Sequence, residues 1–317
     1  MGNTITQKKI TRGLSPAFIR AFVTNDLFTM YEANRDDLFL GIRNEYINIY
    51  YNGANVCKVK YNEKRGTFSC ETAKKYLYGE GEYGKNAYET VMPEDIQRKF
   101  EKIKKNIETI HSPPERAVQQ QLIIKNNANE KSKWFCIDIE YVRQRNNNGE
   151  KAYGRFDTIA ITKVKPHRVA LIELKYGKNA IGPSSGVLKH SQDYIAFIEH
   201  GEYAKHLSYE IVDIVKSLRE LKICPITIND KSDLAEAPEF YFITLDNDRN
   251  EPRNTMRRYV LSDVDGASIH NVQKVEKINI TGPNEKGFTP IFLFSDNKLG
   301  NIQITDIIES ELYSKGL

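Results

Sequence analysis

Two apolar segments of the sequence carry charged side chains of types that catalyse reactions or bind metals. Asp157 lies within the run GRFDTIAI, and Glu173 and Lys175 flank Leu174 in the run LIELK. Because side chains on a strand alternate between its faces, we expect Glu173 and Lys175 to project together, with Leu174 on the opposite face. Ionised groups on a core strand are costly unless they are paired or bind a metal. The pattern therefore indicates either a metal site or an internal ion-pair network.

Further acidic side chains are expected to face Asp157 from the preceding segment. If residues 145–150 (RNNNGE) form the turn between two strands, Asp157 lies opposite either Asp138 or Glu140. Carboxylates that face each other across a sheet repel and destabilise it. A divalent cation relieves that repulsion, because Mg²⁺ is held by one or two carboxylates, waters and phosphate oxygens. Either register favours a cation between the two strands.

Asp157, followed after a turn by Glu173-Leu174-Lys175, resembles the D…(D/E)xK signature of the PD-(D/E)xK superfamily of restriction-endonuclease-like nucleases. A following helix carries Gln192 and Tyr194, where related nucleases often have Gln and Tyr. Phe156 stands where the signature has Pro, a departure common in the superfamily. The resemblance covers about residues 113–250 and leaves the two ends of the chain uncovered.

The resemblance implies a metal-dependent nuclease that hydrolyses phosphodiester bonds. Asp157 and Glu173 would hold Mg²⁺ or Mn²⁺ with the backbone carbonyl of Leu174, and Lys175 would orient or help to activate the attacking water. The chemistry agrees, since a bound divalent ion lowers the pKa of its water and neutralises the charge that develops on phosphorus. DNA is the expected substrate, and a role in prokaryotic defence or repair follows from the family alone. The alternative is a nuclease-like fold without turnover, which binds nucleic acid or serves as a scaffold.

Glu115 has two interpretations of equal weight. Related nucleases often carry an acidic residue on the first core helix, and Glu115 shares a helical face with Val118 and Leu122. The segment Ser112-Pro113-Pro114-Glu115 is also a capping box, which explains the acidic residue without a metal. Glu115 and Glu140 are therefore both candidates for a further metal ligand.

Substrate contacts are expected from basic and polar residues around this site. The chain has 46 Lys and Arg against 42 Asp and Glu, so its net charge of +4 does not by itself indicate a polyanionic partner. A local basic surface can nevertheless dock a phosphate backbone. The candidate substrate-binding residues are Lys178, Lys189, His190, Gln192 and Tyr194.

Two other patterns in the sequence resemble functional sites, but no function is assigned to them. The segment GEGEYGKN (residues 79–86) imitates a phosphate-binding loop, but Asn86 replaces the required Ser or Thr and a helix is expected before it, where a strand is needed. The six His lack the spacing of a zinc site, and the four Cys form no CxxC pair, so reduced thiols and no zinc are expected.

The elements expected around the site follow the order αβββααβ. They are a helix at 113–125, strands at 133–143, 154–163 and 168–175, helices at 187–200 and 207–221, and a strand at 239–245. We therefore expect an α/β fold with an αβββαβ restriction-endonuclease-like core, preceded by an N-terminal helix and β-hairpin module.

Two domains are expected, at residues 1–110 and 111–317. The first should hold a helix at 15–32, strands at 37–51 and 54–61 joined by the Asn52-Gly53 turn, and a helix at 92–111. It is a candidate for sensing or for substrate binding. The C-terminal extension carries strand candidates at 258–262 and 289–294 and an amphipathic stretch at 304–313.

Composition sets the remaining limits. With 40% hydrophobic and 10% aromatic residues the chain should fold. No stretch approaches the roughly 18 apolar residues of a membrane span, and the N-terminus lacks the apolar core of a signal peptide. A cytoplasmic protein without membrane contact is expected, and a homo-oligomer is compatible with the sequence.

Overall fold

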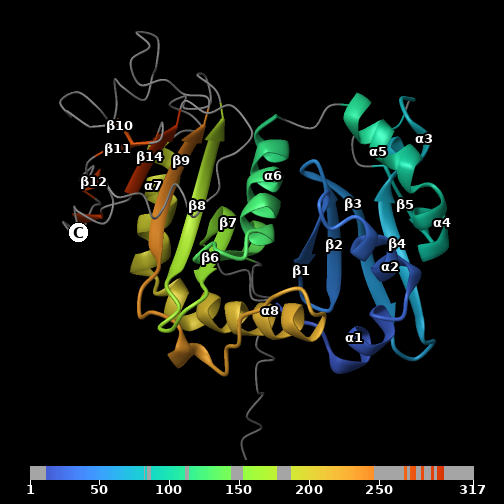
Figure 1. Cartoon of the computed structure of the whole chain (residues 1–317), viewed down its shortest axis with the longest axis horizontal. Coiled ribbons are helices and arrows are strands. Elements are labelled where there is room, and N and C mark those ends of the chain that lie inside the picture. The colour runs from blue at the N-terminus through green and yellow to red at the C-terminus, as the bar shows by residue number, and fades with distance from the viewer. Residues whose placement is uncertain are drawn as a thin grey trace, which may run out of the picture.

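The computed structural model describes residues 12–81, 83, 87–110, 114–143, 153–176 and 187–245 of the 317-residue chain, together with short strands between residues 268 and 295. The fold is mixed α/β, with one antiparallel sheet and one mixed sheet side by side (Figure 1). Within the described residues, no helix combines the length and the apolar composition needed to cross a membrane.

The N-terminal sheet has five antiparallel strands in the order β1-β2-β3-β4-β5. The expected Asn52-Gly53 turn joins β2 and β3, and both of its residues have the positive φ that this turn requires, 51° and 74°. Glycine is also needed at position 53 because an added Cβ would lie 2.4 Å from the Cβ of Arg116. The strands are β1 (Leu38–Ile42), β2 (Tyr46–Tyr51), β3 (Ala54–Asn62), β4 (Thr67–Ala73) and β5 (Tyr88–Val91).

This module holds more sheet than the expected hairpin. The run expected as one strand at 37–51 is divided into β1 and β2 by a turn in which Glu45 has a φ of 56°. Strands β4 and β5 were not expected, and residues 72–77, interpreted as helix, are strand up to Ala73. Phe68, Cys70 and Thr72 are buried at alternate positions of β4, a period-two pattern that the helical interpretation overlooked.

Five helices cover the N-terminal sheet. The expected helix at 15–32 is interrupted where Asn25 caps a new helix, and the one expected at 92–111 is interrupted at Lys99. Its apolar stripe is buried as expected, at Ile96, Phe100, Ile103 and Ile107. The helices are α1 (Pro16–Phe22), α2 (Asp26–Ala33), α3 (Lys74–Tyr78), α4 (Pro93–Arg98) and α5 (Phe100–Thr109).

The second sheet has seven strands in the order β10-β11-β14-β9-β8-β7-β6. Strands β6, β7 and β8 are successive antiparallel neighbours, β8 and β9 are parallel, and β14 continues the sheet parallel to β9. The strands are β6 (Trp134–Val142), β7 (Arg155–Thr162), β8 (Val169–Tyr176), β9 (Glu239–Leu245), β10 (Ser268–Ile269), β11 (Val272–Val275) and β14 (Ile291–Ser295), and β12 (Ile280–Thr281) and β13 (Gly287–Phe288) form a separate pair.

Helices cover both faces of this sheet. Val118 and Leu122 of α6 (Pro114–Ala128) pack with Leu174 on one face. Tyr194 and Phe197 of α7 (Val187–Glu199) pack with the opposite face, and α8 (Ser208–Glu220) follows a short π-helical turn, Tyr203–Leu207. A sheet covered on both faces buries strands β7 and β8 almost completely.

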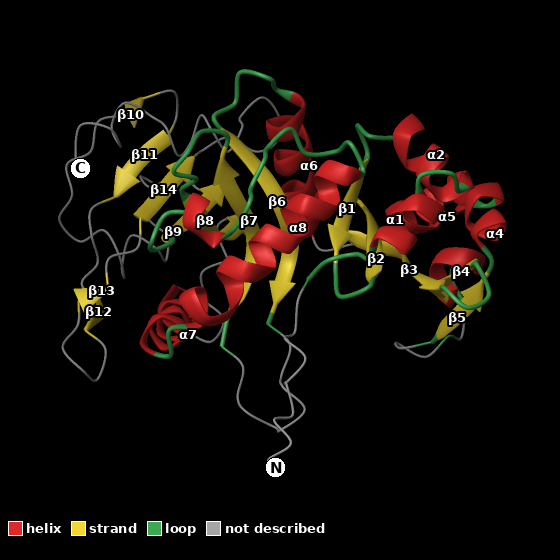
Figure 2. Ribbon diagram, turned by 90° about the horizontal axis from the view of Figure 1, so that it is seen from below, coloured by secondary structure: helices red, strands yellow, loops and turns green. Residues whose placement is uncertain are grey.

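The two sheets share a packed boundary. Helix α6 lies between them, and α8 runs across the lower end of both (Figures 1 and 2). One continuous apolar core includes Phe18 and Leu40 of the N-terminal module as well as Phe156 and Ile214 of the second half. The expected strand at 289–294 corresponds to β14, whereas the segments at 258–262 and 304–313 lie outside the described residues.

Candidate active site

The site begins with a contact between two antiparallel strands. The regular pairing of β7 with β8 ends at Thr158 and Ile172. One residue further on, a carboxylate oxygen of Asp157 accepts a hydrogen bond from the backbone N–H of Leu174 at 2.9 Å. A side chain thus continues the connection where the backbone ladder stops, and it holds the Asp157 carboxylate against β8.

Glu173 and Lys175 lie together, as the alternation of strand residues predicts. The Nζ atom of Lys175 lies 2.6 Å from Oε1 of Glu173, and Nε2 of His190 on α7 lies 3.0 Å from the same oxygen. Glu173 is only 3% exposed and Lys175 only 7%. Two nitrogens therefore converge on one buried carboxylate.

Helix α6 brings three further side chains to the cluster. Oε1 of Glu115 lies 3.9 Å from Nζ of Lys175, and its Oε2 accepts a hydrogen bond from the backbone N–H of Tyr176. The Nε2 atom of Gln119 donates to the backbone carbonyl of Asp157. Arg116 lies 3.5 Å from the carboxylate of Glu140. The first two turns of α6 thus contact the strands at the site.

The register of β6 and β7 decides which acidic residue faces Asp157. Ile139 pairs with Thr158 and Tyr141 with Phe156, so Glu140 is the residue opposite Asp157. Asp138, the other candidate, is fully buried and bonded to two arginines from the N-terminal module. The sequence left both alternatives open because the turn after β6 sets this register and its length could not be fixed from the sequence.

The pKa values of two carboxylates in the cluster, Asp157 and Glu115, are raised. Burial, and then the charge of Glu173, raise the pKa of Asp157 well above its ordinary value, although Lys175 and the Leu174 N–H oppose the shift. Burial also raises the pKa of Glu115, against the effect of Lys175. Glu140 contributes to both upward shifts. The four acidic groups therefore lie within electrostatic reach of one another.

Glu173 and Lys175 are stabilised in their charged forms. Burial alone would raise the pKa of Glu173, but the bonds from His190 and Lys175 outweigh it and lower the pKa below the ordinary value. Burial alone would lower the pKa of Lys175, but Glu173 and Glu115 outweigh it and raise the pKa. The arrangement favours one ionised carboxylate and one ammonium, with Asp157 the more easily protonated neighbour.

The donor set fits a divalent cation with oxygen ligands. Asp157, Glu173, Glu115 and Glu140 offer carboxylates, and Lys175 lies among them. Within the described ranges, no three His, Cys, Asp or Glu side chains are gathered closely enough to hold a metal as they stand. The pKa of Asp157 is raised first by burial and then by the charge of Glu173, and a hard cation such as Mg²⁺ would offset the repulsion from Glu173.

The structure does not bring all of the expected substrate-binding residues to this cluster. Tyr194 is 3% exposed, and its ring stacks on Phe240 at 4.1 Å between centroids within the aromatic core. His190 joins the cluster through Glu173 rather than standing free. Lys178 lies outside the described residues, and the side chains of Lys189 and Gln192 on α7 also lie outside them.

Four polar residues at or near the site were not identified from the sequence. Gln119 and Arg116 lie on α6, and Arg12 and Arg43 reach the adjoining part of β6 from the N-terminal module. A signal for Gln119 existed, because it follows Glu115 by four positions and so shares its helical face. Arg12 and Arg43 lie more than 90 residues from Asp138, and no local pattern connects them.

The chain matches no protein-family model, no curated protein and no solved structure. The functional assignment therefore rests on the residues of the site and their geometry.

Proposed function

We propose that this protein is a metal-dependent nuclease of the PD-(D/E)xK type that hydrolyses phosphodiester bonds, with DNA as its substrate. The observation that carries the proposal is the convergence of Asp157, Glu173 and Lys175 at one end of the β7–β8 pair. Asp157 accepts a hydrogen bond from the backbone N–H of Leu174 at 2.9 Å, and Lys175 lies 2.6 Å from Glu173. A (D/E)xK pair separated from its aspartate by a turn requires this placement on adjacent antiparallel strands.

The order of elements around the site supports the same assignment. Helix α6 is followed by the antiparallel strands β6, β7 and β8, then by α7 and, after α8, by β9 parallel to β8. Helices α6 and α7 cover opposite faces of the sheet. This is the arrangement that we expect of an αβββαβ restriction-endonuclease-like core.

Asp157 and Glu173, with the backbone carbonyl of Leu174, are the residues that would hold Mg²⁺ or Mn²⁺. Glu140 and Glu115 are the candidates for a further acidic ligand. When bound, the ion supplies a water of lowered pKa and neutralises negative charge on the phosphate. The raised pKa of Asp157 and Glu115 supports this assignment, because both carboxylates gain from an added positive charge.

The remaining chemistry belongs to the side chains of the chain itself. Lys175 keeps its proton, because its pKa is raised by Glu173 and Glu115 against the effect of burial. It therefore offers an ammonium group that can orient the attacking water and stabilise charge on the phosphoryl oxygens. The contact with His190 fixes the carboxylate of Glu173, and Gln119 holds the backbone at Asp157. Such support limits the movement of catalytic groups.

The second candidate function is a nucleic-acid-binding or scaffold protein without turnover. The ion pairs among Lys175, Glu173 and Glu115 favour it, because a lysine inserted between carboxylates can satisfy them without a cation. The two functions differ in whether nucleic acid is cut or only bound.

Incubation of the full chain with supercoiled plasmid and with linear single-stranded and double-stranded DNA tests the proposal. Each substrate is incubated with Mg²⁺, with Mn²⁺ and with EDTA. Cleavage is expected with either metal, and loss of cleavage is expected in Asp157→Asn and Lys175→Met. Lys131→Met, which removes an exposed lysine in the turn between α6 and β6, is the matched control and should cut normally. Binding without cleavage in the presence of both metals would favour the second candidate.

A further inference from the structure

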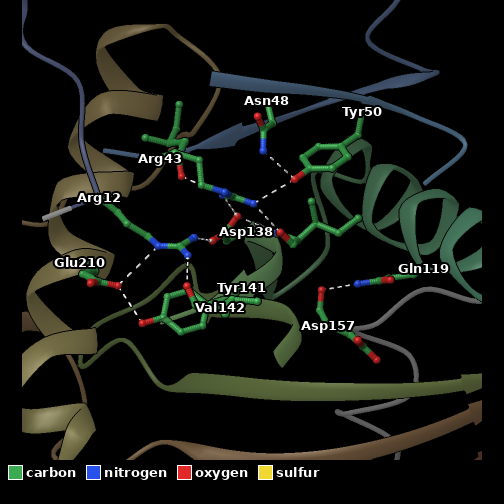
Figure 3. Close-up of polar contacts among 12 residues, drawn as sticks. Arg12, Arg43, Asn48, Tyr50, Gln119, Asp138, Tyr141, Val142, Asp157 and Glu210 are labelled. Carbon is green, nitrogen blue, oxygen red and sulfur yellow. Dashed lines mark hydrogen bonds and ion pairs between the residues drawn. The ribbon is translucent and has the colours of Figure 1, made fainter. Parts of the chain in front are cut away.

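A buried ion-pair hub joins the N-terminal module to strand β6. Asp138 is completely buried, and its two carboxylate oxygens lie 2.7 Å from Nη1 of Arg12 and 2.5 Å from Nη1 of Arg43. The arginines converge on it from the N-terminal module, as Figure 3 shows. Both guanidinium groups are themselves at least nine-tenths buried. This geometry fixes the module on β6, since a buried charge that loses its partner is strongly unfavourable.

The same arginines also hold the backbone on both sides of Glu140. Nη2 of Arg43 donates to the carbonyl of Ile139 at 2.8 Å, and Nη2 of Arg12 donates to the carbonyl of Val142 at 2.5 Å. The guanidinium of Arg12 also lies over the ring of Tyr141, 4.2 Å from its centroid. Residues 138–142 are thereby attached to the module at every position except Glu140.

Glu140 adopts a backbone conformation that such attachment explains. Its φ of 52° lies in the left-handed region, which is unfavourable for a residue other than glycine and persists only where the surroundings impose it. Arg43 and Arg12 hold the backbone on both sides of Glu140 in this conformation, through their bonds to the carbonyls of Ile139 and Val142. The result places Glu140 opposite Asp157, with its carboxylate 3.5 Å from Arg116.

We propose that Arg12 and Arg43 are positioning residues of the active site, which keep Glu140 facing Asp157 and so make the acidic cluster depend on docking of the N-terminal module. The inference rests on the proposed function, because it assigns Glu140 a part in holding the cation. It also gives the N-terminal module a role, since its described residues supply no side chain to the cluster but hold the strand that supplies one.

A double-mutant cycle in the full chain tests the inference. Arg43→Lys keeps a positive charge beside Asp138, but an ammonium group cannot also reproduce the forked contact with the Ile139 carbonyl. The readout is the rise in melting temperature on addition of Mn²⁺, measured as a titration for wild type, Arg43→Lys, Glu140→Gln and the double variant. If Arg43 acts through Glu140, each single variant needs about 10-fold more Mn²⁺ than wild type to reach half of the full rise in melting temperature. The double variant then needs no more Mn²⁺ than either single variant.

Arg143→Lys is the matched control. Arg143 is also buried, it pairs with Glu202 at 2.8 Å, and it lies three positions beyond Glu140 without contacting the module through that pair. Its variant should titrate with Mn²⁺ as wild type does. A wild-type titration in Arg43→Lys, or losses that add in the double variant, would overturn the inference while leaving the nuclease proposal intact. No Mn²⁺ response in wild type would overturn both. Should Arg43→Lys fail to fold, Arg12→Lys takes its place in the cycle.

Discussion

The carboxylate of Asp157 accepts a hydrogen bond from the backbone N–H of Leu174, the residue between Glu173 and Lys175. This contact ties the single aspartate of β7 to the middle of the ExK segment of β8, and it fixes the spacing of the two carboxylates across the sheet. It also opposes the rise in the pKa of Asp157, since the bond stabilises the ionised form. The site is therefore partly organised by a hydrogen bond between a side chain of β7 and the backbone of β8.

Cleavage should depend on each of the three central residues. Asp157→Asn, Glu173→Gln and Lys175→Met should each lower the rate of metal-dependent cleavage by about 100-fold or more, because each removes a charge that acts on the transition state. Circular dichroism should show the native fold in all three. A variant that retains the wild-type rate on a substrate cut by the native enzyme would contradict the assignment of that residue.

The two carboxylates should affect stability with opposite signs when metal is chelated. The pKa of Asp157 is raised in the folded state, so its stabilising contribution is present below the ordinary value of 3.8 and is lost as the pH rises through the raised pKa. The pKa of Glu173 is lowered, so its contribution is present above 4.5 and is lost as the pH falls through the lowered pKa. At pH 7 in EDTA, Asp157→Asn should raise the melting temperature and Glu173→Gln should lower it.

The expected size of these changes follows from the linkage between protonation and folding. One pKa unit corresponds to about 1.4 kcal/mol, which changes the melting temperature of a domain of this size by about 3 °C. The rise caused by Asp157→Asn should shrink as the pH is lowered toward 4 and the native Asp157 becomes protonated. Thermal melts of the two variants in EDTA between pH 4 and pH 8 measure this pH dependence of the melting temperature. Changes of the same sign at pH 7 would show that the two carboxylates do not differ in this way.

Much of the central cluster could be anticipated from local sequence. Because side chains alternate between the two faces of a strand, Glu173 and Lys175 were expected side by side, and the Nζ atom of Lys175 lies 2.6 Å from Oε1 of Glu173. Asp157 could be assigned to the neighbouring strand, because turn residues separate the two apolar runs. The partner of Asp157 on β6 could not be chosen, because Asp138 and Glu140 share one face of their strand and the length of the turn that sets the register could not be fixed from the sequence.

The relation between the two halves of the chain could not be anticipated. A sequence pattern reports short-range periodicity, whereas Arg12 and Asp138 are separated by 126 positions and meet only through the packing of two sheets. Tyr194 shows the opposite error, because the resemblance to nucleases with Gln and Tyr on this helix suggested substrate contact, whereas its ring is packed in the core. Strand β4 was not expected, because its sequence has few apolar residues and its last residues were interpreted as the start of a helix.

Glu115 and Glu140 can be distinguished as cation ligands by conservative variants. Glu115→Gln keeps a side chain able to accept the Tyr176 N–H, and Glu140→Gln removes a charge that faces Asp157. Each change should raise the melting temperature slightly in EDTA, by about 1–3 °C, because it relieves repulsion between carboxylates. A residue that holds the cation should in addition reduce the rise caused by Mg²⁺. A rise of wild-type size in both variants would leave Asp157 and Glu173 as the only side-chain ligands.

The buried hub at Asp138 should dominate the stability of the boundary between the two sheets. Asp138→Ala leaves the guanidinium group of Arg43 buried without a carboxylate and leaves that of Arg12 only the more distant Glu210, at 3.6 Å, which should cost about 3–5 kcal/mol. Glu32→Ala removes one partner of an ion pair with Arg35 in which both side chains are about 40% exposed, and it should cost less than about 1 kcal/mol. Urea unfolding followed by tryptophan fluorescence compares the two, because the single tryptophan, Trp134, begins β6. Equal losses would mean that Asp138 is replaceable and that the remaining contacts hold the N-terminal module on the sheet.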